Sequence, residues 1–192
     1  MSTNKKIKII NGQTCRRHVN PDGSMGGWVS ETAYVAPTAN VAAKAMVLDT
    51  ARIFGNARIF DNAWVFGEAQ VYDEAWVFSG ARVSGKARVY EHATICGCAT
   101  LRENPRIYGN AQISGHAEIS GNANVCDDAV VSDNCKVGDW ALVAGNARLA
   151  GNVLVISHAQ VTDDACLYDQ VVVCGRSRVS GATRISGTAL VY

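Results

Sequence analysis

The sequence predicts an all-β solenoid, and three observations support that prediction. From Ala33 onward a small residue recurs at every sixth position, and 21 of the 27 such positions hold alanine. Two residues after each of them stands Val, Ile or Leu, without exception through Val191. The fifth position of the hexad is most often Gly or Asp, and the sixth is frequently Asn. A helix does not fit, because six is a poor multiple of 3.6 and Gly and Asn recur throughout.

Each hexad encodes one short strand and one turn. In the unit Ala-x-Val-x-Gly/Asp-Asn the two apolar residues are two apart, so both point to the same face of a strand. Gly, Asp and Asn accept left-handed backbone angles, which lets the chain turn after each strand. Repeating a strand and a turn every six residues produces a polygon with its apolar residues inside. We therefore expect one solenoid over residues 33–192, made of 27 uninterrupted hexads.

Residues 1–32 break the repeat and predict an N-terminal capping hairpin. The alternating segment 6–10 is typical of a strand, and Asn11 and Gly12 after it are typical of a tight turn. Residues 15–19 would form the partner strand, followed by a second turn at 20–23. A cap is expected there, because the end of a solenoid exposes strand edges. The other end stops inside a hexad at Tyr192, which predicts tail-to-tail association.

Composition excludes several classes of function. A net charge of +1 gives no electrostatic reason to expect nucleic acid or an anionic membrane as a partner. The apolar runs are too short to span a bilayer, and the first residues lack the apolar region of a signal peptide. Seven cysteines, an odd number, argue against a disulfide framework. We therefore expect a cytoplasmic protein.

The hexads resemble the hexapeptide-repeat, left-handed parallel β-helix superfamily, and within it the YdcK-like proteins of bacteria and phages. The resemblance rests on GNARIF at 55–60, GKARVY at 85–90 and GSMGGWV at 23–29, and the repeat covers 160 of 192 residues. It implies three hexads per coil, and hence about nine coils. YdcK-like proteins are often described as acetyltransferases, so it also implies acetyl-CoA. The chain departs from acyltransferases in one respect: Phe, Tyr, Ser or Cys follows the aliphatic residue, where Gly, Ala, Glu or Asp is usual.

With 18 residues per coil, one outward face gathers arginines beside a column of aromatic rings. Such a face could stack on a base or sugar, or hold the phosphates of coenzyme A. It could instead be structural, since aromatic pairs stabilise neighbouring strands and arginine stems lie over them. The candidate residues for binding a ligand or partner are Arg52, Phe54, Tyr72, Arg88, Tyr90, Arg106 and Tyr108.

Another outward face is apolar at both of its ends. We expect residues 1–32 to cover part of the N-terminal group, which includes Leu48 and Trp64. Monomers seldom expose large contiguous apolar patches, so the C-terminal group predicts a homo-oligomer. The candidate interface residues are Leu154, Ile156, Val172, Leu190 and Tyr192.

The histidines argue against a metal site within one chain. His92, His116 and His158 each occupy the last position of a hexad, and their separations of 24 and 42 residues place them at three different corners. We therefore expect no metal, because a zinc site of the γ-carbonic anhydrase type needs three converging histidines. Acidic corner pairs such as 127–128 and 163–164 are more typical of turns than of cation sites.

The favoured functional prediction is a non-catalytic scaffold or binding module that acts through its outward faces, without a cofactor and with a possible protein partner. The alternative is an acyl-CoA-dependent acyltransferase with a site between subunits, in which His92 or His116 serves as the base. No loop interrupts the hexads to wall such a site, which favours the first prediction.

Overall fold

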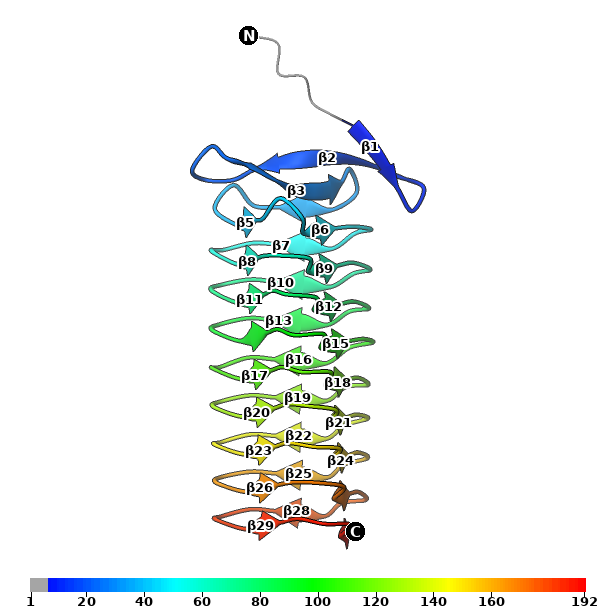
Figure 1. Ribbon diagram of the computed structural model, residues 1–192, viewed down its shortest axis with the longest axis vertical. Helices are drawn as coiled ribbons and strands as arrows, with labels where there is room; N and C mark the ends of the chain where they lie inside the picture. The colour runs from blue at the N-terminus through cyan, green and yellow to red at the C-terminus, as the bar shows by residue number, and fades with distance from the viewer. Residues whose placement is uncertain (1–6) are drawn as a thin grey trace.

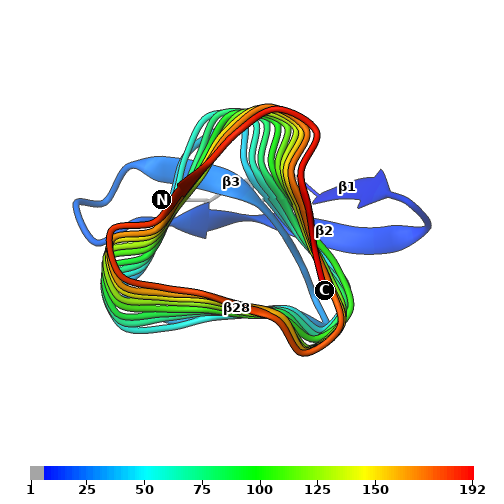
Figure 2. The same ribbon diagram turned by 90° about the horizontal axis from the view of Figure 1, so that it is seen from below.

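The computed structural model describes residues 7–192 as a three-sided stack of short parallel strands with an antiparallel cap at its N-terminal end (Figure 1). Seen along the axis, successive coils superpose as a triangle (Figure 2). Almost every strand of the stack has two residues, the second and third of a hexad, and no helix occurs in the described part of the chain. The expected all-β solenoid is confirmed.

One side of the prism, the tyrosine sheet, holds nine strands in parallel register. Its strands are β4 (Tyr34–Val35), β7 (Arg52–Ile53), β10 (Gln70–Val71), β13 (Arg88–Val89), β16 (Arg106–Ile107), β19 (Asn124–Val125), β22 (Leu142–Val143), β25 (Gln160–Val161) and β28 (Arg178–Val179).

The second side, the tryptophan sheet, also holds nine parallel strands. Its strands are β5 (Asn40–Val41), β8 (Arg58–Ile59), β11 (Trp76–Val77), β14 (Thr94–Ile95), β17 (Gln112–Ile113), β20 (Val130–Val131), β23 (Arg148–Leu149), β26 (Cys166–Leu167) and β29 (Arg184–Ile185).

The third side, the cap sheet, has twelve strands because the N-terminal segment adds to it. Its strands are β1 (Ile7–Ile10), β2 (Gln13–Val19), β3 (Met25–Ser30), β6 (Met46–Val47), β9 (Trp64–Val65), β12 (Arg82–Val83), β15 (Thr100–Leu101), β18 (Glu118–Ile119), β21 (Lys136–Val137), β24 (Leu154–Val155), β27 (Val172–Val173) and β30 (Leu190–Val191).

The interior consists almost entirely of the two apolar residues of each hexad. Ala111 and Ile113, like their equivalents in neighbouring coils, are fully buried. Cys135 replaces alanine at one of these positions, and burial raises the pKa of its thiol to about 11. Small residues at the corners and branched residues on the sides therefore fill a narrow triangular core.

The turns explain why the fifth residue of most hexads is Gly or an acid. That residue has a positive φ in every hexad from Asp49 to Gly187. Where it is acidic, its carboxylate accepts the amide of the residue one coil later; Asp133 Oδ2, for example, accepts Gly151 N at 2.9 Å. In the acidic pair 127–128, Asp127 accepts an amide from the next coil and Asp128 accepts from Asn110 of the previous coil. These carboxylates therefore stabilise turns, and the described residues contain no cluster suited to a metal ion.

The cap confirms the expected hairpin and extends it by one strand. β1, β2 and β3 pair antiparallel, and β3 then pairs parallel with β6, so the cap is continuous with the prism. Asn20 Oδ1 accepts Val41 N at 2.9 Å, which ties the second cap turn to the first coil. Leu48 in the first coil is only 2% exposed. Residues 1–6 of the predicted cap lie outside the described residues.

His18 makes the stability of the cap depend on pH. Burial lowers the pKa of His18, and its ring Nε2–H donates to the carbonyl of Ala39 at 3.2 Å. The unfolded chain then binds the proton more readily, so the free energy of unfolding falls as pH drops below about 6.5. We expect His18→Gln to reduce this fall between pH 7 and pH 5 in chemical denaturation. His116→Gln changes an exposed histidine instead, and an equal effect of both substitutions would contradict the assignment.

Candidate functional site

The tyrosine sheet aligns the predicted arginines in one column. Arg52, Gln70, Arg88 and Arg106 lie in register on β7, β10, β13 and β16. Their side chains leave the sheet because the apolar residue that follows each of them points into the core. Arg88 and Arg106 are therefore direct neighbours, about 4.8 Å apart at the backbone by the spacing of parallel strands.

A continuous aromatic stack runs beside this column. The ring centroids of Phe54 and Tyr72 are 5.5 Å apart, those of Tyr72 and Tyr90 are 4.9 Å apart, and those of Tyr90 and Tyr108 are 5.1 Å apart. The last two pairs are parallel within 6°. Tyr34 extends the stack toward the cap, with its centroid 6.4 Å from that of Phe54. The structure thus brings together all of the predicted aromatic residues.

The environment keeps the phenols neutral. Burial raises the pKa of Tyr72 and of Tyr90. The Cys126 side chain, together with burial, raises the pKa of Tyr108 far above its usual range. Among the described residues, the hydroxyls of Tyr72 and Tyr90 have no hydrogen-bond partner, so each can donate to a bound molecule.

In the described part of the chain, the arginines beside the stack lack acidic partners. Arg52 lies over the ring of Phe54, with its guanidinium carbon 5.5 Å from the centroid. Within residues 7–192 neither Arg88 nor Arg106 forms an ion pair, although other charged residues do. Like charges on directly paired residues destabilise a sheet. An anion placed between Arg88 and Arg106 would relieve that repulsion.

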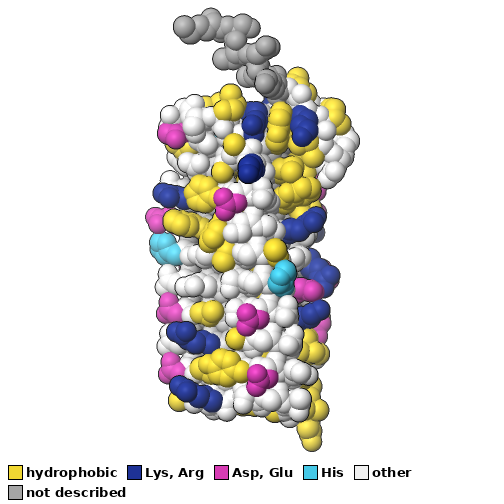
Figure 3. All heavy atoms as spheres, viewed as in Figure 1, with side chains coloured by type: hydrophobic (Ala, Val, Ile, Leu, Met, Phe, Trp, Pro, Cys, Tyr) yellow, Lys and Arg dark blue, Asp and Glu magenta, His cyan; other side chains and the backbone are white. Residues whose placement is uncertain are grey.

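The predicted interface residues form the C-terminal part of the cap sheet. Leu190 is 60% exposed and Tyr192 is 89% exposed, while Leu154, Ile156 and Val172 are half-buried. The salt bridges of Glu118 separate these residues from the apolar group near the cap. In the space-filling view a hydrophobic end protrudes beside the C-terminus (Figure 3).

The histidines do not converge. His92, His116 and His158 follow strands of three different sheets, β13, β17 and β24. His92 Nδ1 lies 3.5 Å from Glu74 Oε2, and both side chains are largely exposed. His158 stacks in parallel on Trp140, with centroids 5.4 Å apart. The prediction of three separate corners agrees with this arrangement.

Two features of this surface were not predicted from the sequence. Glu74 and His92 are 18 residues apart, so the coil repeat could have identified the pair. The same spacing relates Trp140, which is 59% exposed, to His158. Both pairs lie at corners of the prism, outside the strand positions that make up its faces.

The chain is similar to a known repeat and to a solved structure. Residues 51–67, which include Arg52 and Phe54, match the YdcK Beta solenoid repeat. A crystal structure of a hexapeptide transferase family protein from Anaplasma phagocytophilum is similar, with a TM-score of 0.45 and 12% identity over 68% of this chain and 74% of that chain. None of the curated proteins matches the sequence. The described residues form no helix with the length and hydrophobicity that a membrane span requires.

Proposed function

Because the chain is a hexapeptide-repeat β-solenoid with a YdcK-type repeat, we propose that it is a non-catalytic binding module whose tyrosine sheet recognises an acidic polypeptide segment. The observation that supports this most is the pair of adjacent arginines, Arg88 and Arg106, without a carboxylate partner in the described structure. Carboxylates are the natural partners of arginine, and the neighbouring Tyr72 and Tyr90 hydroxyls add hydrogen-bond donors. The seven thiols, all free, fit a cytoplasmic location.

Removing one arginine and its neighbouring ring tests this proposal. We expect the Arg88→Ala/Tyr90→Ala variant to lose binding of a labelled Asp/Glu-rich peptide, measured by fluorescence anisotropy. Its thermal midpoint should stay within about 5 °C of the parent, because both side chains lie outside the core. The binding of the parent should weaken with added salt.

Arg148→Ala is the matched control, since it removes an exposed arginine from the tryptophan sheet. If this variant lost peptide binding equally, the loss in the double variant would be explained by net charge and not by the tyrosine sheet. Unfolding of the double variant would support a structural role for the stack instead.

One observation favours acyl transfer as a second candidate function. In the Glu74–His92 pair the carboxylate lies at Nδ1, which leaves Nε2 of His92 free to take a proton from an acceptor hydroxyl or amine. Acetyl-CoA would supply the acyl group as a thioester. Such sites in hexapeptide acyltransferases lie between subunits, so this candidate needs an oligomer, which the C-terminal patch of the cap sheet would support.

Molar mass in solution distinguishes the two candidates. We expect light scattering over a concentration series to show self-association through the C-terminal patch. A trimer with acetyl-CoA-dependent transfer that His92→Gln reduces by about 100-fold or more would establish the enzyme. A monomer or a tail-to-tail dimer would remove the cleft and leave the binding module.

A further inference from the structure

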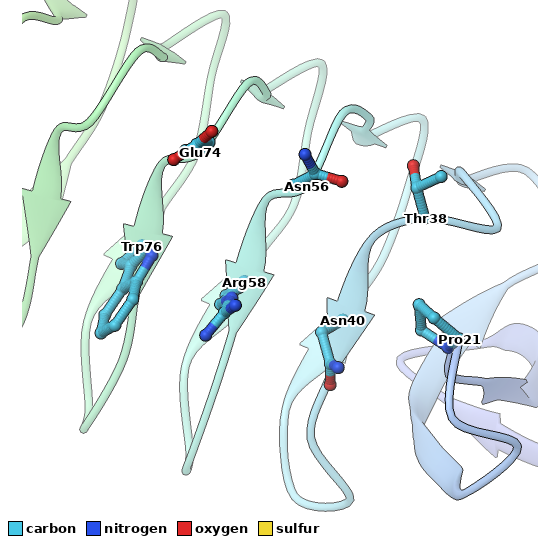
Figure 4. A pocket seen from close by; sticks show the side chains of 7 residues that line it. All are labelled: Pro21, Thr38, Asn40, Asn56, Arg58, Glu74 and Trp76. Carbon is cyan, nitrogen blue, oxygen red and sulfur yellow. The ribbon is translucent and has the colours of Figure 1, made fainter.

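A groove on the tryptophan sheet lies apart from the tyrosine sheet and shares only Glu74 with the Glu74–His92 pair. It has a volume of about 410 Å³ and extends over three coils below the cap (Figure 4). Asn40, Arg58 and Trp76 form one wall on β5, β8 and β11. The corner residues Thr38, Asn56 and Glu74 form the other wall, and Pro21 of the cap turn closes one end.

Among the described residues, the side-chain amides in this groove have no hydrogen-bond partners, although the same corner pairs its polar side chains elsewhere. Further along this corner, Asn110 donates to Asp128 and Asn146 donates to Asp164, each at 2.9 Å. Asn56 has the equivalent neighbour Glu74, but within residues 7–192 the side-chain amide of Asn56 forms no hydrogen bond. Glu74 lies against His92 instead. The side chain of Asn40 is likewise without a hydrogen-bond partner in the described structure.

Trp76 provides an aromatic surface that is shared by two hollows. Its side chain is 42% exposed, in contrast to the half-buried Trp28 and Trp64. Arg58 lies 5.2 Å from the ring centroid, and the Phe60 ring meets the indole edge to face at 6.2 Å. A second hollow of about 280 Å³, which includes Phe60 and Phe78, adjoins the same indole. The surface is thus polar on one side of Trp76 and apolar on the other.

From these observations we infer that the groove binds a neutral oligosaccharide. The opposite charges of Arg58 and Glu74 cancel, so the lining of the groove favours neither an anion nor a cation. Sugar hydroxyls both donate and accept hydrogen bonds. The side-chain amides of Asn40 and Asn56, which have no partner among the described residues, offer both functions. The apolar C–H face of a sugar ring suits an exposed indole, which combines a large apolar surface with a polar edge. The two hollows flanking Trp76 provide space for consecutive sugar rings.

Indole resonances give a direct test, because the chain has only four tryptophans. We would titrate ¹⁵N-labelled protein with cellotetraose, maltotetraose and chitotetraose at millimolar concentration. We expect at least one of these sugars to shift the indole N–H signal of Trp76, assigned by its loss in Trp76→Phe. Trp76→Ala should weaken the binding at least about tenfold, and Asn56→Ala by a smaller factor.

Trp140→Ala is the control, since it removes another exposed indole, one that does not line the groove. The inference is overturned if none of the three sugars shifts the Trp76 signal, or if Trp76→Ala binds as tightly as the parent. It is also overturned if binding occurs only with acidic polymers such as heparin. The tyrosine sheet is unchanged in these variants. Peptide binding through Arg88 and Tyr90 can therefore be measured independently of sugar binding, and the two proposals can fail separately.

Discussion

Replacing Ile113 by alanine is expected to lower the free energy of unfolding by about 3–4 kcal/mol. Ile113 is fully buried on β17, and it stacks between Ile95 and Val131 of the adjacent coils. Each coil contacts only its neighbours, so the cavity has no other layer that can collapse into it. Urea denaturation followed by far-UV circular dichroism measures the change.

The neighbouring residue supplies the control for Ile113. Gln112 lies on the same strand, but its side chain is exposed. Gln112→Ala should change the free energy of unfolding by less than about 0.5 kcal/mol. Similar losses in the two variants would mean that the alternation of inward and outward residues is not what stabilises the coil.

Replacing Gly115 by alanine is expected to cost about 3 kcal/mol, from two separate causes. Gly115 has a φ of +66°, which L-residues with a Cβ adopt at a cost. A Cβ atom there would also lie 2.6 Å from the backbone nitrogen of Asp133 in the next coil. Backbone atoms at this distance must move, which disturbs the ladder between the two coils.

Gly175 separates the two causes, because it occupies the same hexad position with a φ of +69° but has no atom within 4 Å of the place that a Cβ would take. Gly175→Ala should therefore cost only about 1 kcal/mol. Both variants can be compared by urea denaturation. An equal cost at the two sites would show that strain in φ, rather than contact between coils, decides which turns need glycine.

The columns of residues on each outward face could be predicted from the sequence. A strict hexad without insertions places each residue beside the one 18 positions later, so Arg88 beside Arg106 and Tyr90 beside Tyr108 follow from counting. The cap hairpin could also be predicted from the sequence, because Asn11 and Gly12 mark its turn. The continuation of the hairpin through β3 into the cap sheet could not be predicted, because residues 25–30 do not follow the hexad.

The sequence by itself determined the solenoid, its turns and the order of residues along every face, because these depend on a period that local chain geometry enforces. Only the tertiary structure decided which of the aligned groups interact. The Asn110 side chain donates to Asp128, while within residues 7–192 the side chain of Asn56 at the same corner has no partner, because Glu74 lies against His92 instead. Such choices depend on side-chain rotamers and on packing between coils and cap, and a period fixes neither of these.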